Sequence, residues 1–284
     1  SSSPSGFFSR QIVCSALLVW LLLVAGSDLA KADPQEQDKA IAVISELRGV
    51  VETDPKTPGN PVVYVELGNT KVTDAELAHI SSLSGLRKLS LHNTKVTDAG
   101  LVHLKGLSNL DTLTLDSTAV TNAGLAHLAG LTKLSGLGLK GTKITDAGLV
   151  HLKGMENLDS IELGFTQIGD EGLSHIKGAM RLQHLGLMSS HVTDAGLAHL
   201  SGLTRLEELY VGATQVTDAG LAHLEGLKEL RVLSLADTQV TDAGLPRLKV
   251  LAKLQWLDLK STRVTAASVA DFQKAFPKAK VSFD

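Results

Sequence analysis

Aliphatic residues recur along this chain with a period of 24 residues, in the phrase LxxLxLxxTxVTDAGLxHLxGL. One copy shows the two spacings that the phrase contains. Leu89 and Leu91 are two residues apart, so they point to the same side of an extended strand. Leu101 and Leu104 are three apart, as on one face of a helix. Each repeat therefore predicts a strand, a turn and a short helix, which in this copy spans about 98–105.

A threonine in the middle of the phrase marks how far the repeats extend. It stands at Thr70, Thr94, Thr118, Thr142, Thr166, Thr214, Thr238 and Thr262, with Ser190 in the remaining copy. A leucine-based period of this length is typical of a solenoid. Because strands that are joined through helices must lie parallel, we expect an α/β fold. It would have a parallel inner sheet of about ten strands and short helices on the convex side.

The segments that flank the repeats predict caps. Nine repeats run over residues 62–277. We expect residues 278–284 to add a capping strand, because Val281 lies 24 residues after Leu257. Residues 33–61 indicate an amphipathic helix followed by a turn-rich segment. A cap is needed at this end because the first repeat would otherwise expose its apolar face to water.

Residues 1–32 have the pattern of a secretory signal peptide. Arg10 precedes an apolar run over 12–25, and Ala30 and Ala32 flank Lys31 in an Ala-x-Ala cleavage motif. The run is shorter than the roughly 20 residues of a membrane span. We therefore expect an exported mature chain without a membrane span, located in the periplasm, the cell envelope or the medium. An uncleaved anchor is the alternative.

Composition and charge narrow the classes of function. Cys14, the only cysteine, lies inside the predicted signal peptide. The mature chain would thus have no thiol for a disulfide, for catalysis or for a metal. Removal of Arg10, Lys31 and Asp28 leaves 25 basic against 29 acidic side chains, a net charge of −4. A nucleic-acid-binding surface would call for a basic excess, so no nucleic-acid partner is expected.

The sequence contains no arrangement of residues that is typical of catalysis. It has no G-x-S-x-G turn, no H-E-x-x-H helix and no glycine loop of the phosphate-binding kind. The strand acids Glu66 and Glu162 are four repeats apart, roughly 19 Å by the spacing of strands. Paired glycosidase carboxylates lie ~5–9.5 Å apart. We expect neither an enzyme nor a bound cofactor.

Three polar columns run through the repeats. The histidines are His79, His103, His127, His151, His175, His199 and His223; the aspartates are Asp74, Asp98, Asp146, Asp170, Asp194, Asp218 and Asp242. Both sets suit the helix macrodipole, the histidines near helix C-termini and the aspartates in first turns. Metal binding is the alternative, but a single-file column supplies one ligand per layer where a metal needs several. We favour no metal site, and we expect the threonine column to form hydrogen bonds between turns.

The LxxLxLxxT stretch resembles the consensus of the leucine-rich-repeat superfamily, with threonine where asparagine or cysteine usually stands. The VTDAGL portion is similar to the cysteine-containing repeats of F-box proteins and to 24-residue repeats of exported bacterial proteins. The resemblance covers about residues 62–283. It implies a right-handed solenoid and a role in protein–protein recognition, although the superfamily also includes secreted effectors and adhesins.

The outward-facing strand positions vary most between repeats, so we expect a partner to bind there. Glycines in the middle repeats predict a shallow trough, at Gly136, Gly138, Gly164, Gly186 and Gly212. Larger side chains stand near it, namely Phe165, His184, Met188 and Tyr210. Aromatic residues and methionine are enriched at interfaces. We predict a monomer whose concave face binds a protein or peptide. The alternatives are a secreted effector or adhesin, and an envelope protein that binds a metal or ligand through the histidine or aspartate column.

Overall fold

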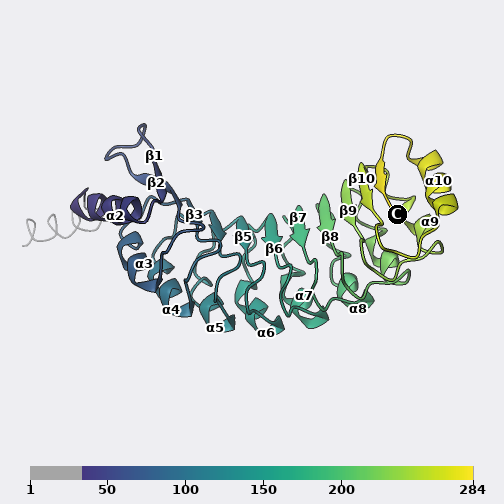
Figure 1. Ribbon diagram of the computed structural model, residues 1–284, viewed down its shortest axis with the longest axis horizontal. Helices are drawn as coiled ribbons and strands as arrows, with labels where there is room; N and C mark the ends of the chain where they lie inside the picture. The colour runs from purple at the N-terminus through teal and green to yellow at the C-terminus, as the bar shows by residue number, and fades with distance from the viewer. Residues whose placement is uncertain (1–33, 284) are drawn as a thin grey trace, which may run out of the picture.

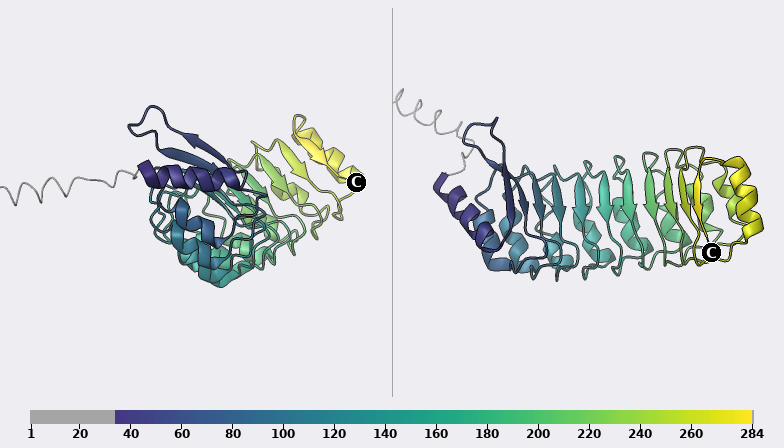
Figure 2. Two further views of the ribbon diagram at one scale, coloured as in Figure 1. Left: turned by 60° about the vertical axis from the view of Figure 1, so that its left-hand side comes forward. Right: turned by 45° about the horizontal axis from the view of Figure 1, so that its top comes forward.

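The computed structural model describes residues 34–283. The predicted signal peptide lies outside this range. The described chain forms an elongated, curved solenoid, with strands along its concave side and short helices on its convex side (Figure 1). In Figure 2 the strands lie side by side in one row between the helices that close the two ends. This is the architecture that the 24-residue period predicts.

A sheet of eleven strands, hydrogen-bonded in chain order, forms the inner layer of residues 34–283. The strands are β1 (Val50–Thr53), β2 (Val62–Glu66), β3 (Lys88–Ser90), β4 (Thr112–Thr114), β5 (Gly136–Gly138), β6 (Ser160–Glu162), β7 (His184–Gly186), β8 (Glu208–Tyr210), β9 (Val232–Ser234), β10 (Trp256–Asp258) and β11 (Lys280–Ser282). From β2 to β11 all pairings are parallel. The prediction of a parallel inner sheet is confirmed.

β1 differs from the other strands because it pairs antiparallel with β2, matching Val51 to Val65. The sequence predicts a helix and a turn-rich segment over 33–61, and β1 is a strand that it does not predict. Pro55, Pro58 and Gly59, which suggested turns, lie in the loop of the hairpin between β1 and β2. The hairpin covers the edge of β2, which would otherwise offer unpaired backbone groups to another chain.

Helices form the outer layer. They are α2 (Pro34–Glu46), α3 (Asp74–Ile80), α4 (Asp98–Leu101), η1 (Val102–Leu104), α5 (Asn122–Leu125), α6 (Asp146–Leu149), η2 (Val150–Leu152), α7 (Asp170–Ile176), α8 (Asp194–Ala198), η3 (Gly220–Leu224), α9 (Leu245–Leu248) and α10 (Ala266–Ala275). In two repeats a single α-helical turn continues directly as a 3-10 helix, labelled η. Such tightening is common at helix ends.

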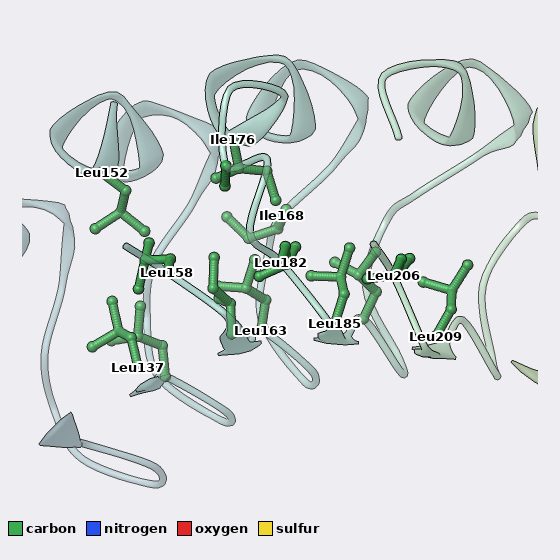
Figure 3. Packing of buried hydrophobic residues seen from close by; sticks show 14 of the residues in the cluster. Leu137, Leu152, Leu158, Leu163, Ile168, Ile176, Leu182, Leu185, Leu206 and Leu209 are labelled. Atoms are coloured by element: carbon green, nitrogen blue, oxygen red, sulfur yellow. The ribbon is translucent and has the colours of Figure 1, made fainter. Parts of the chain in front are cut away.

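The leucine columns pack between the strands and the helices as one continuous core (Figure 3). Leu137 at the centre of β5 and Leu163 just after β6 are both buried. Leu152 lies on the helical side of the core, and Leu158 lies between it and Leu137 (Figure 3). Exposed Lys140 alternates with these inward positions. The predicted facing of the strands is therefore confirmed.

Both ends of the solenoid are covered by helices. α2 buries Ala40 and Ile44 against the first repeat. At the other end, the rings of Phe272 and Phe276 stack with their centroids 4.7 Å apart beside the last repeat. β11 aligns Val281 with Leu257, as the spacing predicts. Between residues 34 and 283, no helix is both long and apolar enough to cross a membrane.

Candidate functional site

The aspartate column joins each repeat to the next. Oδ1 of Asp98 accepts a hydrogen bond from the backbone N–H of Thr121 at 2.8 Å, and Oδ2 accepts one from its hydroxyl at 2.6 Å. The same pair of bonds is made by Asp74, Asp170, Asp194, Asp218 and Asp242. Asn122 makes an equivalent pair with Thr145, its amide donating to the hydroxyl. We call these pairs the Asp–Thr clamps. The aspartates therefore join neighbouring repeats, in addition to their predicted interaction with the helix macrodipole.

From the repeat of Asp98 onward, the clamps explain the glycine that stands two residues after the aspartate or after Asn122. A Cβ on Gly124 would overlap Oδ1 of Asp98, and a Cβ on Gly220 would overlap Oδ1 of Asp194. Glycine therefore leaves room for the carboxylate of the preceding repeat. The aspartate, threonine and glycine of the repeat phrase form one structural unit.

The threonine column does not bridge turns, so that prediction is wrong. The Thr94 hydroxyl donates to the carbonyl of Leu91 at 2.7 Å, within its own turn. The other threonines of the column repeat this bond. Backbone groups connect the turns instead, for example the N–H of Asn93 and the carbonyl of Asp116 at 2.8 Å. Ser190, which replaces threonine, has a buried hydroxyl without a partner among the described residues.

The histidine and aspartate columns are not brought together. Within residues 34–283, no three His, Cys, Asp or Glu side chains are grouped in a way that could hold a metal ion. The aspartate carboxylates accept hydrogen bonds from threonine, as described above. The polar columns therefore offer little support for the alternative of a metal-binding protein.

A different set of polar side chains meets on the concave face. His184 on β7 lies between Glu162 on β6 and Glu208 on β8. Its Nε2 is 2.5 Å from Oε1 of Glu162, and its Nδ1 is 2.9 Å from Oε2 of Glu208. The Tyr210 hydroxyl donates to the same Glu208 oxygen at 3.1 Å. One network thus spans three neighbouring strands.

The network favours a protonated histidine. Both ring nitrogens can donate hydrogen bonds only in the imidazolium form. The hydrogen bond to Glu162 raises the pKa of His184, and the bond to Glu208 and the charges of both carboxylates raise it further, while burial opposes them. Burial, followed by the charge of Glu208, raises the pKa of Tyr210 to about 12. With His184 protonated, the two carboxylates and the imidazolium carry a net charge of −1.

Aromatic rings extend the network along the sheet. The rings of His184 and Tyr210 are tilted with their centroids 5.4 Å apart, and Tyr210 and Trp256 are 6.4 Å apart. His184 and Tyr210 are among the residues predicted from the sequence, but their contacts with Glu162, Glu208 and Trp256 were not predicted. The available signal was the repeat register: residues 24 apart, such as His184 and Glu208, lie side by side on adjacent strands.

Phe165, three residues after Glu162 in the chain, has an unusual backbone conformation. Its φ is +56°, and its side chain is 51% exposed. Every repeat has a left-handed residue at this position, and the others are Asn69, Asn93, Ser117, Gly141, Ser189, Ala213, Asp237 and Ser261. A left-handed bulky residue is a backbone outlier. The ammonium group of Lys140 lies 5.3 Å from the centre of the Phe165 ring.

The glycines do not leave the open trough that the sequence predicted. The space at Gly186 is filled by the Glu162 carboxylate, and that at Gly138 by Asp116. A Cβ on Gly164 would lie 3.1 Å from the carbonyl oxygen of Met188, and one on Gly212 would lie 3.0 Å from that of Ala236. A Cβ on Gly136 would lie 3.2 Å from Cγ2 of Thr112. Glycine here admits neighbouring groups of this chain, and Gly186 in particular makes room for the network.

Comparison with known proteins agrees with the fold. A family model described as "Leucine Rich repeat" matches residues 154–176. No curated protein gives a significant match. Internalin C2 from Listeria monocytogenes is a similar solved structure, with 27% identity, a TM-score of 0.58 and coverage of 86% of this chain and 92% of that one.

Two further solved structures share the fold at lower identity. An internalin from Listeria monocytogenes has 17% identity, a TM-score of 0.54 and coverage of 91% and 94%. A leucine-rich-repeat protein from Leptospira interrogans has 19% identity, a TM-score of 0.54 and coverage of 72% of this chain and 56% of that one. The family model and the similar solved structures support placing the chain, by its repeats and fold, among leucine-rich-repeat proteins. Solenoids of this kind present extended concave surfaces for binding, and they act in general as non-catalytic interaction modules.

Proposed function

We propose that this protein is an exported, non-catalytic recognition module that binds a protein or peptide through the middle of its concave face. The binding surface, which we call the concave patch, consists of Phe165, His184, Met188 and Tyr210 together with Glu162 and Glu208. The sequence-predicted glycines Gly138, Gly164, Gly186 and Gly212 contribute by admitting neighbouring groups rather than by touching the partner.

The observation that carries this proposal is the position of His184 between two glutamates, with Tyr210 bonded to one of them. These contacts fix the side chains before a partner arrives. Ordering of side chains on binding costs about 0.5–1.5 kcal/mol each, so a surface that is already ordered can bind more tightly. A second polar network lies at β2 and β3, where the Tyr64 hydroxyl donates to Glu66 at 2.9 Å and His92 Nδ1 is 3.8 Å from Oε1 of Glu66. There the histidine faces one carboxylate, whereas His184 bridges two.

Phe165 supports the same location. Residues held in the left-handed region cost of order 1–3 kcal/mol and cluster at functional sites. Asparagine, serine or glycine would adopt this left-handed conformation at a lower cost in free energy, and other repeats have these residues at the same position. An exposed aromatic ring that is retained in spite of this cost is explained if a partner contacts it.

The apolar segment 12–25 supports the proposal of export. The remaining alternative is a secreted effector or adhesin that uses the same concave patch. The two differ in where the protein accumulates: a secreted effector would be found in the culture medium, and an envelope protein would remain with the cells.

The proposal is tested by affinity capture with three forms of the chain from residue 33 to 284. They are the wild type, a double variant Phe165→Ser/Tyr210→Ser in the concave patch, and a control Val102→Ser/Val150→Ser. Both valines are exposed on the convex side, so the control removes apolar surface outside the patch. Each captured partner is then purified and its affinity for the three forms is measured by calorimetry.

We expect the wild type and the control to bind the partner equally. The double variant should bind at least about thirtyfold more weakly, since hot-spot residues contribute about 2 kcal/mol or more. Equal affinity for all three forms would place the partner elsewhere and would refute the concave patch. Loss of binding in the convex control alone would move the site to the helices.

A further inference from the structure

One repeat has alanine at a core position where the others have leucine or methionine. The position that follows the glycine of the LxGL phrase contains Ala179 in the repeat of α7. In the other repeats it contains Leu83, Leu107, Leu131, Met155, Leu203, Leu227 and Leu251. Alanine removes most of a buried side chain at this point, and the surrounding core does not close over the space.

A cavity of about 180 Å³ lies there, between η2 and α7 on the convex side. Its apolar lining consists of Leu152, Met155, Leu158, Ile176 and Ala179. Leu152, Leu158 and Ile176 are labelled in Figure 3, between the helices and the strands of two neighbouring repeats. The cavity therefore reaches from the surface into the core of the solenoid.

The lining residues are slightly exposed, which shows that the cavity is open to solvent. Leu152 and Met155 are each 3% exposed and Ala179 is 6% exposed. The equivalent residues of an earlier repeat, Leu104 and Leu107, are 0% exposed. The opening is thus a property of this pair of repeats and not of the solenoid in general.

The chain also takes a different path at the mouth of the cavity. After η2, Lys153 is extended with ψ 121°, whereas Lys105 at the same position of an earlier repeat is helical with ψ −34°. Gly154 then adopts φ +96°, a conformation that glycine allows at no steric cost. This path carries the chain away from the helix end and leaves the mouth open.

The rim of the mouth is basic. Lys153 and Lys177 both line it and both are exposed, as is one acid, Glu156. In the described part of the chain, neither lysine ammonium group makes a hydrogen bond or an ion pair with a side chain. The rim therefore has a net charge of +1 above an apolar interior.

We propose that this convex cavity binds a small carboxylate ligand whose apolar part has the size of one six-membered ring. The volume supports that size, because a dry apolar cavity of about 150 Å³ is large enough for benzene. The free lysines on the rim favour a carboxylate at the outer end of the ligand. The convex cavity does not involve the concave patch, so it stands or fails independently of the proposed function.

Phenylacetate is the probe, and its neutral analogue phenylacetamide is the comparison. The three methionines of the chain are Met155, Met180 and Met188. Labelled with ¹³C at their methyl groups, they give three NMR signals. Met155 lines the cavity, whereas Met188 lies on the concave side and serves as an internal reference. We expect phenylacetate to shift the Met155 signal in a saturable way and to leave the Met188 signal in place.

Two variants separate the apolar and the charged parts of the site. Ala179→Leu restores the side chain of the other repeats and should abolish the Met155 shift while the melting temperature stays equal or rises. Lys177→Gln should weaken phenylacetate about twofold to fivefold, the worth of an exposed ion pair, with phenylacetamide unchanged. Lys105→Gln, at the same position of an earlier repeat, is the matched control and should have no effect.

The proposal is overturned if no saturable shift of Met155 is found up to the solubility limit of phenylacetate, or if Ala179→Leu binds as well as the wild type while remaining folded. Should Ala179→Leu fail to fold, the Lys177→Gln and Lys105→Gln pair decides. If both variants bound phenylacetate with equal affinity, the proposal that the rim lysines bind the carboxylate would be overturned. Equal binding of phenylacetate and phenylacetamide by the wild type would overturn it as well.

Discussion

The Asp–Thr clamps and the concave patch both consist of carboxylates that accept hydrogen bonds across neighbouring repeats, yet they differ in one respect. The clamp recurs from Asp74–Thr97 to Asp242–Thr265. In one interface Gly169 replaces the threonine, so Asp146 accepts only the backbone N–H bond, at 2.6 Å. The network of Glu162, His184 and Glu208 occurs once, at the centre of the sheet. The first is part of what every repeat needs in order to stack. The second is not needed by any repeat for stacking.

This difference indicates how to separate scaffold from function in a repeat protein. A contact that recurs in every copy is explained by the stacking of repeats, because each repeat contacts only its neighbours. A contact found in one copy needs another explanation. The predictions below test whether the two kinds of contact are separable, from the largest expected effect on stability to the smallest.

Replacement of the buried Leu163 by aspartate should have the largest effect. The side chain is fully buried in the core, and an unpaired buried charge is costly. We expect a loss of more than about 4 kcal/mol, or failure to fold. Lys140→Asp, at an exposed position three residues after the centre of β5, is the comparison and should melt close to the wild type. Similar thermal melts of the two variants would contradict the facing of the strands.

Removal of one clamp should have an intermediate effect. Asp194→Ala leaves the backbone N–H and the hydroxyl of Thr217 without their acceptor, and we expect a loss of about 1–3 kcal/mol. Asp194→Asn should cost clearly less, because Asn122 makes both bonds with Thr145 in the natural chain. Chemical denaturation of both variants measures the difference. If asparagine proved as damaging as alanine, the carboxylate would act through its charge rather than through the clamp.

The contribution of His184 to stability depends on pH, and we expect this effect to be smaller than the loss of one clamp. The pKa of His184 is raised in the folded chain, above its ordinary value of about 6.5. Its contribution to stability is therefore complete below that value and is lost as the pH rises through the folded-state pKa. Partial exposure to solvent keeps the effect within about 1 kcal/mol.

Thermal melts of the wild type and of His184→Gln, at several pH values between about 5.5 and 8.5, measure this contribution. The difference in melting temperature should be greatest at the acidic end and should shrink as the pH rises. A difference that stays constant or grows with pH would mean that His184 is not held as an imidazolium between the two glutamates.

Much of the fold could be predicted from the sequence, because a solenoid is defined by its period. The spacing of Leu89 and Leu91 fixes which side of the strand is buried, and the register of Val281 with Leu257 follows from the 24-residue repeat. β1 could not be predicted in this way, because it lies outside the repeat and its pairing depends on the hairpin around Pro58. The candidate site was harder to predict, because contacts between side chains depend on where each side chain points, and the spacing of residues alone does not give this.

The glycines illustrate that limit. From the sequence, Gly186 indicated an empty place on the concave face. In the structure the Glu162 carboxylate occupies that place and bonds to His184. A glycine in a repeat can thus mark space for a neighbouring side chain as well as space for a partner. The predicted trough is filled by Glu162 at Gly186 and by Asp116 at Gly138. The contact of Phe165, His184, Met188 and Tyr210 with a partner stays a prediction.

The most direct test of the account is the variant Phe165→Asn, which should separate stability from binding. Asparagine is enriched among left-handed residues, and Asn69 and Asn93 occupy this position in other repeats. We expect the melting temperature to stay equal or to rise, with a gain of up to about 1 kcal/mol. Loss of the cation–π contact with Lys140 offsets part of this gain.

The decisive measurement is the affinity of Phe165→Asn for the captured partner, made beside its thermal melt. The account predicts a protein at least as stable as the wild type that binds at least about tenfold more weakly, a loss of about 1.4 kcal/mol or more. Unchanged affinity would show that the exposed ring serves no partner. A clear drop in stability would show that Phe165 belongs to the scaffold, and the distinction between the clamps and the concave patch would then fail.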